Sequence, residues 1–353
     1  MRLAEDRILS FVSVFSTGYG TKWIPGCTFY YQPEIRYQTL LTQRRRWING
    51  TFAAFIYFFA SKRASHRVKG GFFDSHKPGK NIRFVSVLWG LQLIQLFLVI
   101  ISPTVFGSLF YLSLGELAEG WNSMHWLTDS IEIGAGIYVN WQIFFLGLFL
   151  AIYVVWSIYS YRVPRGVVPE YICWLICAVG FMMVLPVYYT LYNSRHDHSD
   201  SAMFILVLFT TFVPVLLAFA QSFTCMVLYL AYLPWFLVLV VFFLVFVPSY
   251  SFARVWDTTW GNRDTGPDSE INNAKEIIMK NTALKFITFN ILLNLILCPL
   301  LCALHRYVNK YVYFIALFFP VIIQLICSFT YLFILTPLRV LNRGNIRKSE
   351  IEE

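Results

Sequence analysis

Three adjacent arginines followed by a tryptophan are the residues whose types and spacing most clearly suggest chemistry. Arg44, Arg45 and Arg46 stand between Gln43 and Trp47. Arginine makes bidentate hydrogen bonds to phosphate oxygens, and the flat indole of a tryptophan can stack on a sugar ring or on a base. Taken alone, the run is also typical of a basic patch beside a membrane, so its meaning depends on its neighbours.

A second polar cluster, Glu5, Asp6 and Arg7, lies upstream of the arginines. A carboxylate that a neighbouring cation keeps ionised can act as a general base, although an acidic pair can equally cap the N-terminus of a helix. A base for one proton, cations for a leaving pyrophosphate and a tryptophan platform for a sugar together indicate glycosyl transfer.

The composition shows what kind of protein must position these groups. The chain has 353 residues, of which 58% are hydrophobic and only 13% are charged, whereas a soluble globular protein has about 25% charged residues. This excludes a soluble fold with a polar surface, and it excludes disorder, which needs low hydrophobicity. We therefore expect a polytopic α-helical membrane protein. Its net charge of +9 then reflects basic cytoplasmic loops and contact with lipid or substrate phosphates rather than nucleic acid.

Apolar runs long enough to cross a membrane, about 20 residues each, predict about six transmembrane helices. They are residues 84–112, 143–160, 171–192, one crossing within 203–252, 284–304 and 312–334. The block 203–252 contains three prolines and is long enough to cross twice, so a count one higher stays open. The apolar run 52–60 is too short to span, and the basic residues behind it predict an interfacial helix on the cytoplasmic leaflet.

The distribution of Lys and Arg predicts the orientation. Residues 62–83, 161–170 and the C-terminal tail are basic and are expected in the cytoplasm, together with 253–283. Residues 113–140 contain no Lys or Arg and are expected outside. The cysteine pairs Cys173/Cys177 and Cys298/Cys302 lie in apolar runs without a His or carboxylate at metal-ligand spacing, so we expect them to be buried in helix packing.

Several of these motifs resemble those of chitin synthases, which are processive family 2 glycosyltransferases. Residues 3–9 (LAEDRIL) and 43–52 (QRRRWINGTF) are similar to two of the family's motifs. Residues 256–263 (WDTTWGNR) are similar to its Trp-Gly-Thr-Lys loop, and 161–166 (YRVPRG) to a short basic Pro-Gly loop. On these motifs the resemblance extends over essentially the whole chain.

The resemblance implies transfer of N-acetylglucosamine from UDP-N-acetylglucosamine (UDP-GlcNAc) to a growing β-1,4 chain, which leaves through a transmembrane channel. Asp6 would deprotonate the acceptor hydroxyl, supported by Glu5 and Arg7. Trp47 would stack on the acceptor sugar, and Arg45 would anchor the loop. The residues expected to line the pyrophosphate and acceptor region are Gln43, Arg44 and Arg46. Those expected in a gating loop are Asp257, Trp260, Gly261 and Arg263.

The chain also departs from the family pattern. Trp256 stands where the family has His, and Asn262, Arg263 and Asp264 replace Thr, Lys and Gly of the loop. The family binds a divalent metal, Mg or Mn, through an Asp-x-Asp-like motif, and this sequence contains no Asp-x-Asp. We therefore expect the metal ligands outside this chain and expect the chain to lack the donor-binding half, as a fragment or a split gene product that is inactive alone.

This interpretation divides the chain into parts. Residues 1–50 would be the C-terminal remnant of a cytoplasmic domain of the GT-A type, and 51–83 an interfacial helix and basic loop. The rest would be a transmembrane region at 84–252, a cytoplasmic loop at 253–283, a transmembrane hairpin at 284–335 and a basic tail at 336–353.

Two alternatives stay open. Another processive synthase, making hyaluronan or a β-glucan, would share part of the arginine–tryptophan motif. A non-enzymatic transporter or channel would use the basic patch to bind anionic lipid, but the expected spans contain almost no ionisable residues, which such transport normally requires. The expected partners are UDP-GlcNAc, the growing chitin chain and membrane lipids, with no nucleic acid, a possible homodimer, and the plasma membrane as location.

Overall fold

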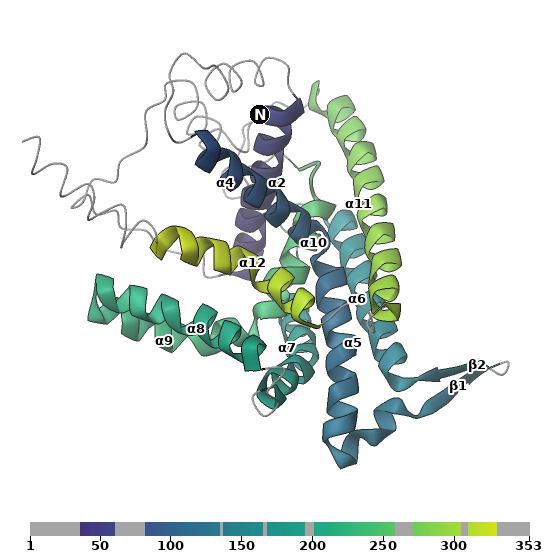
Figure 1. Cartoon of the computed structure of the whole chain (residues 1–353). Coiled ribbons are helices and arrows are strands. Elements are labelled where there is room, and N and C mark those ends of the chain that lie inside the picture. The colour runs from purple at the N-terminus through teal and green to yellow at the C-terminus, as the bar shows by residue number, and fades with distance from the viewer. Residues whose placement is uncertain are drawn as a thin grey trace, which may run out of the picture.

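The computed structural model describes residues 36–60, 82–134, 137–164, 168–194, 201–257, 271–304 and 310–329. In this part of the chain nearly every element is a helix (Figure 1). The helices up to residue 194 are α2 (Tyr37–Ala60), α4 (Ile82–Ile100), α5 (Ser102–Gly120), α6 (Trp141–Arg162) and α7 (Glu170–Asn193). Those after it are α8 (Ser201–Gln221), α9 (Phe223–Val238), the π-helical turn η2 (Phe242–Phe246), α10 (Val247–Ala253), α11 (Ile271–Ala303) and α12 (Lys310–Phe329).

Helix α5 is the centre of the bundle and contacts α6, α7, α11 and α12. Its buried Phe106 packs edge-on against Phe149 of α6, with ring centroids 5.5 Å apart. Gly107 permits this close approach, because a Cβ there would lie 2.8 Å from Cys298 Sγ and 2.8 Å from Phe149 Cε1. Small residues serve this purpose at helix contacts in membranes. Both predicted cysteine pairs are buried in such packing, which confirms the prediction.

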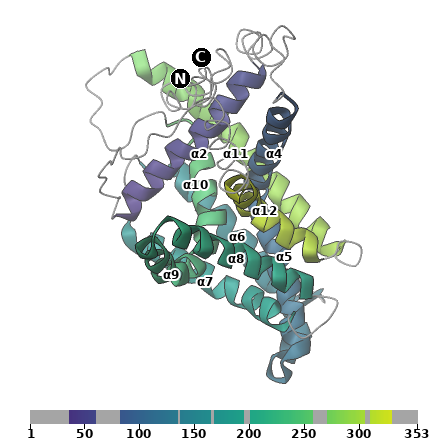
Figure 2. The ribbon, with the colours of Figure 1, turned by 60° about the vertical axis from the view of Figure 1, so that its left-hand side comes forward.

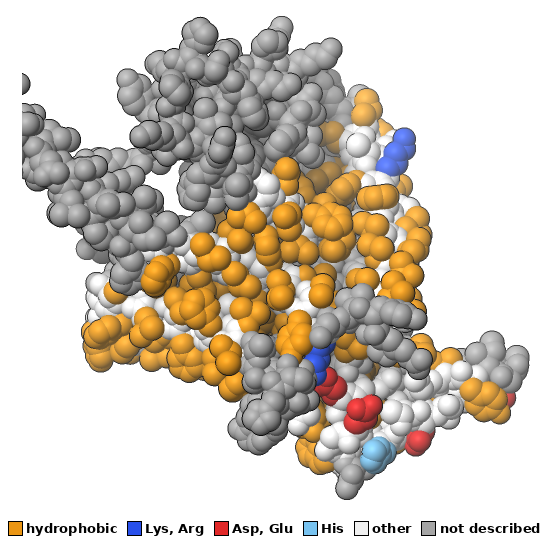
Figure 3. All heavy atoms as spheres, in the orientation of Figure 1, with side chains coloured by type: hydrophobic (Ala, Val, Ile, Leu, Met, Phe, Trp, Pro, Cys, Tyr) orange, Lys and Arg blue, Asp and Glu red, His pale blue; other side chains and the backbone are white. Residues whose placement is uncertain are grey.

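The helices confirm a polytopic helical membrane protein. Among the described residues, three helices are long and apolar enough to cross a membrane, namely Trp141–Arg162, Glu170–Asn193 and Ile277–Ala303, and the number rises to five if two bent helix pairs each count as one span. Phe204–Ala220 and Lys310–Ile326 are shorter apolar helices. Hydrophobic side chains cover most of the described surface in view in Figure 3, while Asp, Glu and His gather at the end that carries the β hairpin. The count of about six spans stays a prediction.

The apolar block expected to contain one crossing is divided into several helical segments. Ser222 separates α8 from α9 and caps α9, since its Oγ accepts a hydrogen bond from Cys225 N at 3.1 Å. Helices α8 and α9 contact each other and lie side by side in both ribbon views (Figures 1 and 2). The chain then bends by 69° between α9 and the segment Phe242–Ala253. The α9–α10 pair is thus a broken span or a re-entrant loop, as the prolines of this block allow.

The first apolar run also differs from the expected helix. It is broken at Ile101, where α4 meets α5 at 64°, and α5 continues to Gly120, so the first part of the expected external loop is helical. The helix outlasts the apolar run because Leu, Glu and Ala near its end are good helix formers. Beyond it lie a short 3-10 turn, η1 (Asn122–Thr128), and an antiparallel hairpin of β1 (Ser130–Gly134) and β2 (Ile137–Asn140).

Side chains of neighbouring helices satisfy the backbone at both bends. The carbonyl of Ile100 accepts hydrogen bonds from the amides of Asn290 and Asn294 in α11, each at 3.1 Å. At the second bend, the carbonyl of Leu237 accepts from Tyr188 Oη at 2.6 Å, and that of Phe246 accepts from Trp156 Nε1 at 2.8 Å. A broken helix is tolerated in lipid only when such partners replace the lost backbone bonds.

Candidate functional site

The arginine–tryptophan motif lies in the middle of α2, which has a buried and an exposed face. Leu41, Arg45 and Asn49, four residues apart, are all buried, because residues at this spacing share one face of a helix. This face packs against α10. Trp47 is 44% exposed on another face of the helix. Helix α2 also runs without a break across the expected boundary between residues 50 and 51, so the predicted interfacial run 52–60 is its last part.

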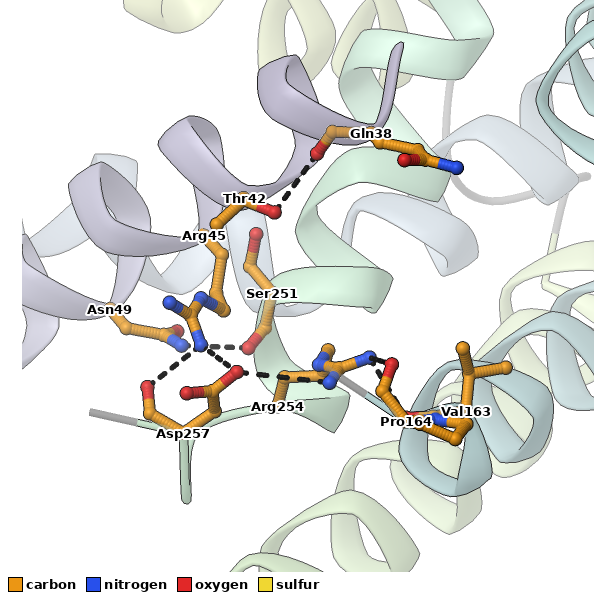
Figure 4. A network of polar contacts seen from close by, with 9 residues as sticks. All are labelled: Gln38, Thr42, Arg45, Asn49, Val163, Pro164, Ser251, Arg254 and Asp257. Atoms are coloured by element: carbon orange, nitrogen blue, oxygen red, sulfur yellow. Dashed lines mark hydrogen bonds and ion pairs between the residues drawn. The ribbon is translucent and has the colours of Figure 1, made fainter. Parts of the chain in front are cut away.

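Arg45 connects this helix to the predicted gating loop. Its guanidinium forms an ion pair with the carboxylate of Asp257, and Nη1 also donates to the Asp257 carbonyl at 3.0 Å (Figure 4). Asp257 is 3% exposed, so the pair is shielded from water. The structure therefore joins two motifs that are 212 residues apart in the sequence. Arg45 does act as an anchor, from within a helix.

Arg254 brings in the third motif. Its Nη2 lies 3.7 Å from Asp257 Oδ2, and its Nη1 donates to the carbonyls of Val163 at 3.0 Å and Pro164 at 3.4 Å. These carbonyls belong to the turn after α6, within the Pro-Gly segment noted in the sequence. One carboxylate and two guanidiniums thus connect α2, the end of α10 and the end of α6 (Figure 4).

Further contacts fix α2 on α10. Asn49 Nδ2 donates to the Ser251 carbonyl at 2.7 Å, and Phe52 meets Phe252 edge-on at 5.2 Å. At the start of the helix, Tyr37 packs edge-on against Trp174 of α7 at 4.9 Å. Burial, and next the neighbouring Cys177, raises the pKa of Tyr37 to about 12, so this hydroxyl is protonated at neutral pH. These contacts hold α2 against α10 and α7.

The exposed side of α2 carries Arg44 and Trp47, two of the residues predicted to bind substrate. The Arg44 guanidinium lies 4.6 Å from the centre of the Trp47 ring, a cation–π arrangement that orders both side chains. An ordered, half-exposed indole beside a guanidinium can accept the apolar face of a sugar next to a phosphate. Gln43 and Arg46 are on the same helix, and both are intermediate in exposure.

Arg45, Arg254 and Asp257 form a charged cluster, and Trp256 and Lys280 lie next to it. Trp256 is 5% exposed, and the Lys280 ammonium is 4.6 Å from the centre of its ring, while Arg254 is 5.6 Å from it. Trp256 is therefore a packed part of this cluster.

Six of the predicted site residues lie outside the described residues: Glu5, Asp6, Arg7, Trp260, Gly261 and Arg263. Their roles stay predictions. In the part that the structure describes, no three His, Cys, Asp or Glu side chains are grouped to hold a metal ion. The expected divalent metal, with its ligands outside this chain, stays a prediction.

Sequence reasoning missed Arg254, although a signal was available. Residues 203–253 contain no charged residue, and Arg254 follows them directly, three positions before Asp257. A cation at the edge of such a block and one helical turn from a carboxylate is a candidate for a buried ion pair. The contact of Arg254 with the turn at Val163 could not be predicted from the spacing of residues in the sequence.

A comparison with known protein families supports the assignment of the arginine–tryptophan helix. The family model described as a chitin synthase-like glycosyltransferase domain matches residues 1–61, which include Glu5, Asp6 and the whole of α2. The segments 161–166 and 256–263 lie beyond the match, so their resemblance stays a prediction. The resemblance to chitin synthases is confirmed over the matched residues, and residues 1–61 are similar to a chitin synthase-like glycosyltransferase domain.

Proposed function

We propose that the chain takes part in transferring N-acetylglucosamine from UDP-GlcNAc to a growing β-1,4 chain and in exporting that polymer through its membrane helices. The main observation behind this proposal is the contact between Arg45 and Asp257. Through it, the arginine–tryptophan helix packs against one end of the helical bundle. The match to a glycosyltransferase domain over residues 1–61 supports it.

In this proposal the acceptor hydroxyl attacks the anomeric carbon, the bond from that carbon to the UDP oxygen breaks, and Asp6 takes the hydroxyl proton. Glu5 and Arg7 hold Asp6 in its ionised form. Arg44, Arg46 and Gln43 compensate the charge of the departing diphosphate, since guanidiniums pair with phosphate in a bidentate way, and Trp47 holds the acceptor sugar. The loop of Trp260, Gly261 and Arg263, reached through Asp257, closes the site.

The exposed indole of Trp47 provides the first test. In purified protein in nanodiscs, we expect Trp47→Ala to bind a chito-oligosaccharide about tenfold more weakly than the unchanged chain, a loss of about 1.4 kcal/mol. Trp47→Phe keeps an aromatic face and should retain most of the affinity. Titration with chito-, hyaluronan and cello-oligosaccharides, followed by calorimetry, measures the effect.

The same titration separates the alternatives. Preference for hyaluronan or a glucan oligosaccharide would favour another processive synthase. Absence of binding to all three, together with binding to anionic vesicles, would favour a non-enzymatic membrane protein. A chimera in which this chain replaces the matching part of an active chitin synthase should incorporate labelled N-acetylglucosamine into a chitinase-sensitive polymer, and Asp6→Asn should abolish that incorporation.

We propose that α2 faces the cytoplasm at the plasma membrane and that the β hairpin faces outward. This rests on the bias of basic residues and on the acidic side chains at the hairpin end (Figure 3). Tyr138 of β2 is 67% exposed and Ala53 of α2 is exposed. On intact cells, a membrane-impermeant thiol reagent should label Tyr138→Cys and should label Ala53→Cys only after permeabilisation. The reverse pattern would overturn the orientation.

A further inference from the structure

Arg254 is a buried cation of the candidate site, and it was not predicted from the sequence. It is 1% exposed, at the residue where α10 ends. Its guanidinium reaches in two directions, to Asp257 Oδ2 at 3.7 Å and to the carbonyls of Val163 and Pro164 at 3.0 and 3.4 Å. The rings of Tyr250 and Trp256 lie beside it, each 5.6 Å from its central carbon.

The neutrality of the buried ion pair does not require this arginine. Asp257 already has Arg45 as a direct partner, with both an ion pair and a hydrogen bond. Arg254 contacts the same carboxylate from farther away, and its Nε and Nη2 have no hydrogen-bond partner in the described part of the chain. A second buried cation on one carboxylate carries a desolvation cost. In addition, Arg254 Nη1 donates hydrogen bonds to the turn after α6, which Arg45 does not contact in any interaction described for it.

We propose that Arg254 is a positioning residue. It couples the Arg45–Asp257 ion pair, and with it α2, to the end of α6, and so sets the position of Trp47 and Arg44 relative to the bundle. It does not touch substrate. The inference rests on the proposed function only in calling the exposed side of α2 a sugar site. The structural part, in which Arg254 contacts the turn after α6 and reaches α2 through Asp257 and Arg45, stands on the contacts alone.

We expect Arg254→Met to combine unchanged stability with a looser connection between α2 and α6. This variant keeps the length of the side chain but leaves Asp257 with Arg45, so the protein should fold, elute as the unchanged chain does on size exclusion and keep its melting temperature. The coupling to the carbonyls of Val163 and Pro164 is lost, so α2 should move more freely relative to α6. Arg254→Lys retains a donor and a charge and should restore part of the coupling.

Spin labels on exposed positions of the two helices, Ala53 in α2 and Ile158 in α6, measure this motion directly. We expect a narrow distance distribution in the unchanged chain, a clearly broader one in Arg254→Met and an intermediate one in Arg254→Lys. Lys310→Met is the matched control. It removes the cation of another part-buried ion pair, 2.7 Å from Glu116, that joins α12 to α5 and involves neither α2 nor α6.

Each possible result either supports or overturns the proposed role of Arg254. A narrow distribution in Arg254→Met would overturn the inference, and so would failure of that variant to fold, because the remaining Arg45–Asp257 pair should keep the protein stable. Broadening in Lys310→Met to the same extent would show general loosening and would also overturn it. Chito-oligosaccharide affinity should fall in Arg254→Met and recover partly in Arg254→Lys. If the unchanged chain binds no such sugar, the proposed function fails, while the distance measurement still decides the role of Arg254.

Discussion

Replacing Asp257 with Asn should destabilise the protein more than any other single change in the charged cluster. Asp257 is the carboxylate that Arg254 contacts in the described part of the chain, and it is also the direct partner of Arg45. The substitution removes this counter-ion from two buried guanidiniums, those of Arg45 and Arg254, and breaking a buried pair in this way costs about 3–5 kcal/mol. We expect the fraction of folded protein to fall sharply in detergent, measured by fluorescence-detected size exclusion and by thermal melting.

A second substitution should recover part of this loss. In Asp257→Asn combined with Arg254→Met, one of the two buried cations that lost this counter-ion is gone while Arg45 remains, so the double variant should be more stable than Asp257→Asn alone. The four proteins of this cycle give the coupling energy between the two residues. Wild-type stability of Asp257→Asn, or no recovery in the double variant, would show that the carboxylate does not balance Arg254.

In the described part of the chain, three helices are long and apolar enough to cross a membrane without a bend. They lie where the sequence predicted them. The apolar runs 143–160, 171–192 and 284–304 correspond to α6, α7 and the apolar part of α11. Such helices are predictable because an unbroken helix satisfies its own backbone, and only length and hydropathy decide whether it can span. The bends at Ile101 and before Phe242 were not predictable. They depend on side chains such as Asn294 and Tyr188, which approach from other helices.

In the candidate site too, the local features were predictable from the sequence, whereas the contacts between distant segments were not. Helical period alone implies that Arg45 and Asn49 share a face while Trp47 lies elsewhere on α2, and the motif itself marked these residues as chemically interesting. Which face becomes buried depends on α10, whose position relative to α2 is a property of the folded chain. The pairing of Arg45 with Asp257 spans 212 residues, and no local pattern specifies a contact of that kind.

Replacing Asn294 with Ala should cause the largest loss of stability within the membrane helices. Asn294 is fully buried and acts as a remote cap for α5, since its Oδ1 accepts from Thr104 N at 3.1 Å and from Thr104 Oγ1 at 2.8 Å. Its amide also donates to the Ile100 carbonyl at 3.1 Å. The first N–H groups of a helix have no partner within it, so the substitution leaves the Thr104 N–H unsatisfied in an apolar interior, which costs about 1–3 kcal/mol.

A matched control distinguishes this capping from simple packing. Ser113 lies on α5 as well and is fully buried, but its hydroxyl has no hydrogen-bond partner in the described part of the chain. Ser113→Ala should therefore change the free energy of unfolding by no more than about 0.5 kcal/mol, because it breaks no specific interaction. Asn290→Ala should fall between the two, because Asn294 still donates to the Ile100 carbonyl when Asn290 is lost. If all three variants melted alike, the bend at Ile101 would not depend on α11, and the break between α4 and α5 would have to be stabilised by Pro103 and local packing alone.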